Sequence, residues 1–172
     1  MRLLDLGCGR TKAPGAVGID IAPMKGVDVV ADLRRGIPVK DGVADEVRCI
    51  SFLEHLPDLV FFMEEVHRVL RPGGILRARV PYFTSNYAFA DPTHLRFFSY
   101  STFDYFTPES HFQYSQARFR ILEKRFKFAH GRLQILGKII EPLTNRFPRL
   151  YERLFAHIVP SDELRVVLEA VE

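Results

Sequence analysis

Two glycines and an aspartate near the start of the chain have the spacing of a nucleotide-binding loop. Gly7 and Gly9 directly follow the apolar run Leu3–Leu6, and Asp20 ends a second apolar run. Glycine lets a ligand approach the backbone closely, and a carboxylate at a strand end can accept hydrogen bonds from a ribose diol. Residues 7–16 are too few for a full phosphate-binding helix. We therefore expect a ligand that does not depend on a helix dipole cradling phosphates.

Two of the six histidines follow predicted strands and could remove a proton from an acceptor. His55 lies in "LEHL" after the run 46–51, and His94 lies in "ADPTHLRF" after the run 75–80. Ligands bind at the carboxyl edge of such sheets, and imidazole titrates near neutral pH. We expect His94 to be the base and Asp91 to orient it. The competing interpretations are satisfied structural histidines and an Asp-Pro helix opening.

No histidine pair has the spacing of a zinc motif, and no cluster of candidate ligands is evident in the sequence. We therefore predict no metal.

These side chains need a scaffold, and the apolar pattern predicts an α/β domain. Short runs rich in branched residues predict buried parallel strands at residues 3–6, 17–21, 27–31, 46–51 and 75–80. Asp58 opens one clear amphipathic helix, which Arg71-Pro72-Gly73-Gly74 ends. Two later strands are predicted at residues 117–128 and 163–171, and residues 133–158 predict amphipathic helix broken at Pro142 and Pro148.

Five motifs, in order and in spacing, resemble the class I S-adenosylmethionine-dependent methyltransferases. They are "LDLGCG" (4–9), "GIDI" (18–21), "ADL" (31–33), "ADEVRCISFLEHL" (44–56) and "LRPGG" (70–74). The stretch from "VPYF" to "DPTHLRFFSYSTFDYF" (80–106) is similar to a compact bacterial and archaeal branch of that family. The resemblance implies S-adenosylmethionine as the cofactor. It also implies a Rossmann-like, mostly parallel seven-stranded sheet with an antiparallel last strand, here with shortened first crossovers and a C-terminal helical insertion.

The resemblance places the methionine part of the cofactor against the glycine loop, Gly7, Cys8 and Gly9. Asp5 would lie near the cofactor ammonium, although a backbone-bound structural aspartate is the alternative, because an unpaired buried carboxylate is costly. Asp20 would bind the ribose hydroxyls.

The remaining cofactor contacts implied by the resemblance concern adenine and the sulfonium. Ile21 would pack on adenine, and Asp32 and Leu33 would reach its amino group and ring. Ser51 and Phe52 would line the channel to the sulfonium. For Asp32, simple capping of a loop is the competing interpretation.

The acceptor is indicated mainly by motifs that the chain lacks. An Asn or Asp followed by two prolines and an aromatic, typical of amino-group methyltransferases of nucleic-acid bases, is replaced by "SFLEHL", and neither cysteine follows a proline. The resembling branch favours a small-molecule or sugar-like acceptor, with O-methylation as the expected reaction. Tyr82, Asn86 and Tyr87 are expected to shape its pocket.

Two alternatives stay open. One is a non-catalytic methyltransferase-like protein that binds cofactor or a partner. The other, ranked lower, is an RNA methyltransferase that uses the basic residues between Arg118 and Arg132 as a backbone track. We favour the solvated face of an edge strand for that stretch, so nucleic acid is not the expected partner.

Bulk properties fit one domain over residues 1–172. The net charge is +3, Cys8 and Cys49 are expected to be reduced thiols, and we find no membrane span or signal peptide, so we expect a cytoplasmic protein. The trimmed crossovers remove helices that would cover one half of the sheet, so another segment must cover it. Within 133–158, apolar residues could pack back as a cap, which is the default, pair with a second subunit or meet a lipid-linked acceptor: Leu133, Ile135, Leu136, Ile139, Ile140, Leu143, Leu150, Leu154, Phe155 and Ile158.

Overall fold

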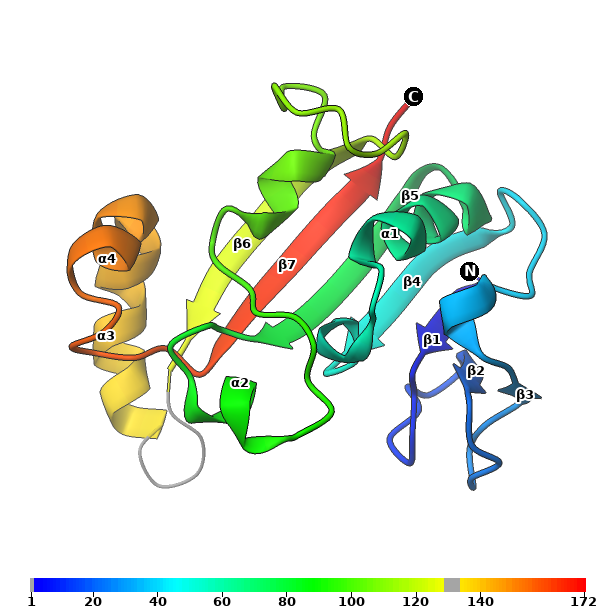
Figure 1. Ribbon diagram of the computed structural model, residues 1–172, viewed down its shortest axis with the longest axis horizontal. Coiled ribbons are helices and arrows are strands. Elements are labelled where there is room, and N and C mark those ends of the chain that lie inside the picture. Colours follow the sequence, from blue (N-terminus) through cyan, green and yellow to red (C-terminus); the bar gives the residue numbers. More distant parts are fainter. Residues whose placement is uncertain (1, 129–133) are drawn as a thin grey trace.

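A seven-stranded mixed sheet forms the frame of the protein (Figure 1). The computed structural model describes residues 2–128 and 134–172. The strand order is β3-β2-β1-β4-β5-β7-β6, and β7 runs antiparallel to both of its neighbours. The predicted fold class is thus confirmed. The strands are β1 (Leu3–Leu6), β2 (Val17–Asp20), β3 (Val29–Val30), β4 (Ala44–Ile50), β5 (Leu70–Pro81), β6 (Phe119–Lys127) and β7 (Glu163–Ala170).

Helices and 3-10 turns connect the strands from β3 onward. They are η1 (Leu33–Arg35), η2 (Leu53–His55), α1 (Leu59–Val69), α2 (Asn86–Ala90), η3 (Thr102–Phe106), α3 (Gln134–Arg146) and α4 (Pro148–Leu154). The connections β1–β2 and β2–β3 contain no helix, as the short crossovers predicted. The glycine loop therefore leads almost directly from one strand to the next.

The helix α1 begins where the capping pattern predicted. The Asp58 carboxylate accepts a hydrogen bond from the Phe61 backbone N–H at 2.9 Å. Its buried face includes Phe62, Met63 and Val66, and the chain passes straight from Val69 into β5 at Leu70. This direct connection fixes the start of β5, whose far end contributes to the candidate site.

From β4 to β6 only one face of the sheet is buried under described elements, which corrects the expectation that another segment covers the second face there. In β5, Leu76, Ala78 and Val80 are buried, whereas Arg77 and Arg79 alternate with them on the other face. Ion pairs cross this open face between neighbouring strands: Arg77–Glu46, Arg79–Glu163 and Arg120–Glu169. The open face is thus polar instead of covered, an arrangement more typical of antiparallel sheets.

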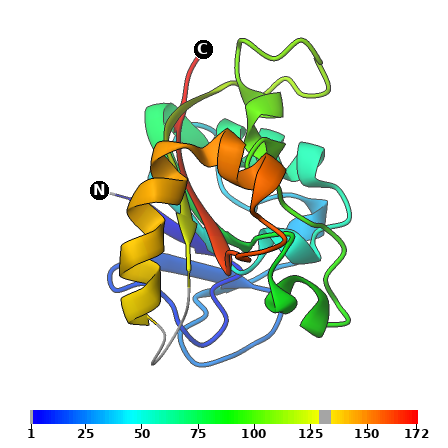
Figure 2. The same cartoon turned by 90° about the vertical axis from the view of Figure 1, so that its left-hand side faces the viewer.

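The segment α3–α4 lies beside the edge strand β6 (Figure 2). Pro142 does not break it, because α3 runs through Pro142 to Arg146, and the break comes only before Pro148. Of the apolar residues expected to pack back, only Ile140 contacts the core, whereas six others are exposed: Ile139, Leu143, Leu150, Leu154, Phe155 and Ile158. The default expectation is wrong for those six. Leu133 and the side chains of Ile135 and Leu136 lie outside the described part.

The basic stretch is on the edge strand, as we favoured. Carboxylates pair with most of its cations: Arg120 with Glu169, Lys124 with Asp104, Arg125 with Glu123 and Lys127 with Glu141. Arg132 lies outside the described residues. This pairing leaves little free positive charge for a nucleic-acid backbone.

Candidate functional site

Two neighbouring cavities, each of about 500 Å³, lie at the carboxyl edge of the parallel strands. The first, here called the β2 cavity, brings together five predicted cofactor residues: Asp20, Ile21, Asp32, Leu33 and Phe52. The second, here called the β5 cavity, is lined by four other predicted residues: Ser51, Tyr87, Asp91 and His94. His55 lines both cavities, so a ligand in one would meet a ligand in the other at this side chain.

The glycine loop beside the β2 cavity needs its glycines. Gly7 has φ +66°, and a Cβ there would lie 2.2 Å from the Phe52 ring. Gly9, at φ +51°, donates its backbone N–H to Asp20 Oδ2 at 2.9 Å. Cys8 is buried between them. The loop is therefore tied to the end of β2, with the Asp20 carboxylate at the cavity wall.

Asp5 is held as a structural aspartate, as the alternative interpretation proposed. It is 1% exposed, and its Oδ2 accepts hydrogen bonds from the Ala13 backbone N–H at 2.7 Å and from the Arg48 guanidinium. Its Oδ1 has no partner among the described residues, so it keeps capacity for a cationic ligand. Arg48 was not predicted from the sequence as the partner of Asp5, although the two residues lie directly opposite each other in the β1–β4 register.

Asp32 caps η1. Its carboxylate accepts from the Arg34 backbone N–H at 3.1 Å and pairs with the Arg34 guanidinium, and this hydrogen bonding lowers the pKa of Asp32 below its usual range. The capping interpretation is thus confirmed, and Asp32 also lines the β2 cavity.

Ser51, which lines the β5 cavity, lies at a strained turn. Its φ of +50° is in the left-handed region, which residues with a side chain rarely occupy. The backbone N–H of Ser51 still donates to the Arg79 carbonyl oxygen at 2.9 Å. The chain therefore turns sharply off β4 and directs η2, with Glu54 and His55, along the carboxyl edge.

Hydrogen bonds fix the tautomers of both predicted histidines. His94 Nδ1 lies 3.1 Å from the Ala88 carbonyl oxygen, which can only accept, so Nδ1 carries the proton. The Thr93 hydroxyl donates to Asp91, so it accepts from His55 Nδ1 at 2.9 Å. In each ring, Nε2 therefore keeps a free lone pair. Asp91 therefore orients His55 through Thr93. Contrary to the expectation that Asp91 orients His94, its carboxylate forms no described hydrogen bond with the His94 ring.

Glu54, which the sequence analysis did not single out, lies beside these histidines. Its side chain is 1% exposed, neither carboxylate oxygen has a partner among the described residues, and burial raises the pKa of Glu54 to about 7. The His55 and His94 rings are 4.7 Å apart, and burial lowers the pKa of His55.

Glu54, His55 and His94 also each offer one ligand atom, all within 4.8 Å of one another, so these three residues could hold a divalent cation. The motif spacing that predicted no metal did not reveal this cluster.

The three predicted acceptor residues have different places. Tyr87 lines the β5 cavity, whereas Asn86 is exposed at the start of α2 and does not line it. Tyr82 is fully buried and donates its hydroxyl to Glu152 at 2.9 Å, so it is a core residue. The predicted role of Tyr82 in the pocket is therefore wrong, because the side chain after β5 points into the core.

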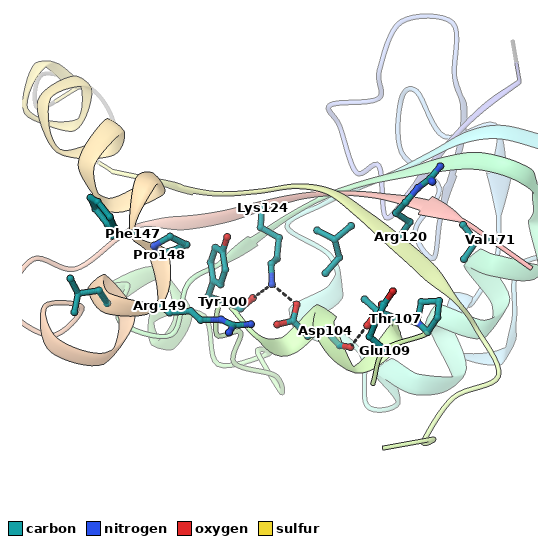
Figure 3. A pocket seen from close by; sticks show the side chains of 13 residues that line it. Tyr100, Asp104, Thr107, Glu109, Arg120, Lys124, Phe147, Pro148, Arg149 and Val171 are labelled. Carbon is teal, nitrogen blue, oxygen red and sulfur yellow. Dashed lines mark hydrogen bonds and ion pairs between the residues drawn. The ribbon is translucent and has the colours of Figure 1, made fainter. Parts of the chain in front are cut away.

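A larger cavity, of about 770 Å³, lies away from this edge, between η3, β6 and α4 (Figure 3). Lys124 crosses it and donates to the Tyr100 carbonyl oxygen and to Asp104. Val171, which directly follows β7, lines the cavity. The end of β7 pairs with β5 at Ile75, so this part of the cavity lies toward the amino end of β5. Its lysine is already satisfied, and the predicted site residues do not line it.

Comparisons with known proteins agree with this geometry. A family described as "Methyltransferase domain" matches residues 4–78. A search of curated proteins found no match. The fold is similar to that of an S-adenosylmethionine-dependent methyltransferase from Archaeoglobus fulgidus, with 18% identity and a TM-score of 0.60, covering 98% of this chain and 85% of that one.

Two further solved structures show how widely this fold is used. One is an S-adenosylmethionine-dependent methyltransferase from Mesorhizobium loti, with 17% identity and a TM-score of 0.61, covering 98% of this chain and 90% of that one. The other is the [4+2]-cyclase SpnF, with 19% identity and a TM-score of 0.60, covering 99% and 75%. The family match covers the motif region at residues 4–78, and the solved structures share the fold, so this part of the chain carries the sequence pattern of a methyltransferase domain on a fold that S-adenosylmethionine-dependent methyltransferases use.

Proposed function

We propose that this methyltransferase transfers the methyl group to an oxygen of a small or sugar-like acceptor bound in the β5 cavity. The observation that carries the proposal is the fixed tautomer of His94, which leaves a proton-accepting Nε2 in a cavity next to the cofactor residues. When bound, S-adenosylmethionine supplies an electrophilic methyl group on a sulfonium.

The chemistry requires an aligned acceptor and one proton acceptor. His94 Nε2 would take the proton of the acceptor hydroxyl as that oxygen attacks the methyl group, and the sulfur of the cofactor would leave as a neutral thioether. His55 lies between the two cavities and positions the acceptor, held by Thr93 and Asp91. Tyr87 forms part of the acceptor wall.

The cofactor contacts follow from the β2 cavity. Asp20 would bind the ribose hydroxyls through lone pairs that its hydrogen bonds from the Gly9 and Ala22 N–H groups leave free. Ile21 and Leu33 line the β2 cavity and would flank the adenine, and Asp32 would reach its amino group. Phe52 and Ser51 would line the path to the sulfonium. Asp5 Oδ1 is buried without a described partner, and Asp5 would contribute negative charge near the ammonium behind the glycine loop, Gly7 to Gly9.

Calorimetric titration tests the cofactor half of this proposal. S-adenosylhomocysteine should bind and NAD should not, and Asp20→Ala should weaken binding by roughly tenfold or more, since a charge-assisted hydrogen bond is worth about 1.5–3 kcal/mol. A matched control is Asp162→Ala, because Asp162 lines the β5 cavity only.

Turnover on a panel of hydroxyl, carboxyl and amine acceptors tests the other half. Methylation of hydroxyl compounds that is lost in His94→Asn supports O-methylation. Cofactor binding without any turnover supports the non-catalytic alternative. Methylation of RNA would require the basic edge strand to bind phosphates despite its ion pairs.

A further inference from the structure

The segment α3–α4 exposes a continuous apolar surface, here called the α3–α4 surface. Two rows of exposed apolar side chains form it, and successive members of each row are four residues apart in the sequence. The first row is Ile139, Leu143 and Phe147, and the second is Leu150, Leu154 and Ile158. Phe155 is also exposed beside them. Ile139 is 71% exposed and Ile158 is 74% exposed. An apolar cavity of about 400 Å³ lies among these side chains. Soluble monomers rarely leave such a patch open, so it indicates an interaction surface.

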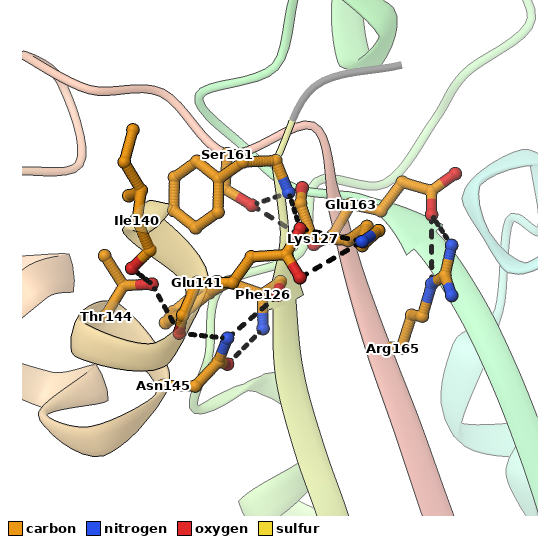
Figure 4. A network of polar contacts seen from close by, with 10 residues as sticks. Phe126, Lys127, Ile140, Glu141, Thr144, Asn145, Ser161, Glu163 and Arg165 are labelled. Atoms are coloured by element: carbon orange, nitrogen blue, oxygen red, sulfur yellow. Dashed lines mark hydrogen bonds and ion pairs between the residues drawn. The ribbon is translucent and has the colours of Figure 1, made fainter. Parts of the chain in front are cut away.

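The opposite side of α3 explains why the apolar side faces outward (Figure 4). Asn145 accepts from the Phe126 N–H at 2.7 Å and donates to the Phe126 carbonyl at 3.1 Å, and Glu141 pairs with Lys127. These bonds cap the free edge of β6. The helix therefore turns its hydrogen-bonding side to the protein and its apolar side to solvent, the reverse of an ordinary surface helix.

Positive charge accompanies the apolar rows. Lys138, Arg146, Arg149 and Arg153 are exposed, and no described carboxylate forms an ion pair with them. The two acidic residues within α3 and α4 are engaged inward: Glu141 with Lys127, and Glu152 with the Tyr82 hydroxyl and the Tyr100 N–H. The surface is therefore apolar and cationic, without competing negative charge of its own.

We propose that the α3–α4 surface binds the anionic interface of a lipid membrane. Apolar side chains next to Lys and Arg are the pattern of a helix that lies in the headgroup region. Each cation near an anionic leaflet adds attraction. No helix in the described part of the chain is long and apolar enough to cross a membrane, so this contact is peripheral.

A second copy of the chain is the less favourable occupant. A twofold contact places the same patch on both partners, so the cations of one copy would face those of the other. Like charges across a contact are destabilising, whereas anionic headgroups would neutralise them. The proposal goes beyond methyl transfer and does not depend on it.

Vesicle co-sedimentation of the full chain tests the proposal. The wild-type protein should sediment with vesicles that contain phosphatidylglycerol and much less with vesicles of phosphatidylcholine alone. The variant Arg146→Gln/Arg153→Gln should bind the anionic vesicles roughly 25-fold more weakly, at about fivefold per charge, since each contributes about 1 kcal/mol. The variant Ile139→Ser/Leu143→Ser/Ile158→Ser should lose binding by more than about tenfold.

Matched controls keep the test decisive. Leu122→Ser and Arg125→Gln change exposed side chains of β6 outside the surface, and they should leave vesicle binding unchanged. All substituted residues are exposed, so circular dichroism should confirm an intact fold in every variant. Failure of the wild type to bind anionic vesicles overturns the proposal. A wild-type dimer in sedimentation velocity that the triple serine variant dissociates would also overturn it and assign the surface to a second copy.

Discussion

Three titratable side chains meet at one point of the β5 cavity wall, two of them adjacent in sequence and the third about 40 residues later. Glu54 and His55 come from η2, and His94 comes from the segment after α2. Each histidine gives its Nδ1 proton to an oxygen, so both present a free Nε2, and Glu54 brings a carboxylate without a described partner. Such a group can move a proton or hold a cation, and the two roles exclude each other for His94.

Replacing His94 tests the proton-transfer role. His94→Asn keeps a side chain of similar size but cannot accept the proton, so kcat should fall by about 10²- to 10⁴-fold. The affinity for S-adenosylhomocysteine should stay within about twofold, because the loss affects the reaction and not uniform binding. Steady-state kinetics and calorimetry measure both quantities. His111→Asn, at an exposed position, is the matched control, and an unchanged kcat in His94→Asn would remove His94 from the mechanism.

Zinc ions distinguish the two roles of the same cluster. If His94 is the base, Zn²⁺ bound by Glu54, His55 and His94 should inhibit methyl transfer, because it occupies the lone pair that must take the proton. EDTA should restore activity, Glu54→Gln should weaken inhibition, and Mg²⁺, which prefers oxygen ligands, should have little effect. Activation by Zn²⁺ would instead make the metal part of the reaction.

At the scale of single residues, the prediction was best where a motif position also requires its residue type for a physical reason. Gly7 and Asp20 are where the loop argument placed them, because φ and the close approach of Phe52 allow no side chain at Gly7. Asp5 was singled out because a carboxylate within an apolar run is costly to bury without a partner. Glu54 also lies between apolar residues in the sequence, so the same argument would have identified it. Tyr82 was mispredicted, because nothing in the sequence shows which way a side chain turns after a strand.

The strands β5 and β7 carry an alternation of apolar and polar residues that does not fit a fully buried parallel strand. Residues 75–80, "ILRARV", alternate apolar and polar side chains, and so does much of β7. That period indicates one buried and one solvated face. Reading these residues as a fully buried parallel strand led to the expectation of a second covering layer, whereas ion pairs on the open face replace it. The helix boundary at Asp58 was predicted well because capping is a local property.

One element, α1, depends on an ionic clamp that pH should reveal. Arg68 pairs with Glu65 at 2.7 Å and Asp41 at 2.6 Å and donates to the carbonyl oxygens of Ile37 and Val39. Glu65→Gln should lower the free energy of unfolding at pH 7 by about 1–3 kcal/mol, because charge-assisted hydrogen bonds are lost. Urea unfolding measures this change.

The sign of the pH dependence follows from the pKa of Glu65, which the hydrogen bond from Arg68 lowers in the folded state. The stabilisation is therefore complete above the unfolded pKa of about 4.3 and is lost as the pH falls through the lower folded value. The difference between the wild type and Glu65→Gln should shrink below about pH 4. Glu109→Gln, at an exposed position, should show no such difference, and a gap that persists in acid would contradict the clamp.

At the scale of the whole molecule, the two ends of the sheet are unequal. On one side β5, β7 and β6 pair over long registers, whereas on the other side β3 contributes only Val29 and Val30, both exposed. The β1–β3 side has no crossover helices to support it. The β2 cavity spans this weak side and the rest of the protein, since its lining includes Asp20 and Leu33 but also Leu56 and Leu95. A bound cofactor should therefore hold the weak side in place.

Hydrogen exchange with and without S-adenosylhomocysteine measures this effect. A ligand at 100 times its Kd stabilises the binding-competent state by about 2.7 kcal/mol, so amides of β2 that exchange through opening of the cavity should slow by about 100-fold. Amides in the exposed loop at residues 109–113 should not change, because they exchange without opening the cavity. Asp20→Ala should abolish the slowing at an equal ligand concentration. Slower amide exchange in β6 and β7 alone would place the cofactor away from the β2 cavity. Slower exchange in β2 and η1 alone would show that the cofactor stabilises the weakly supported side of the sheet.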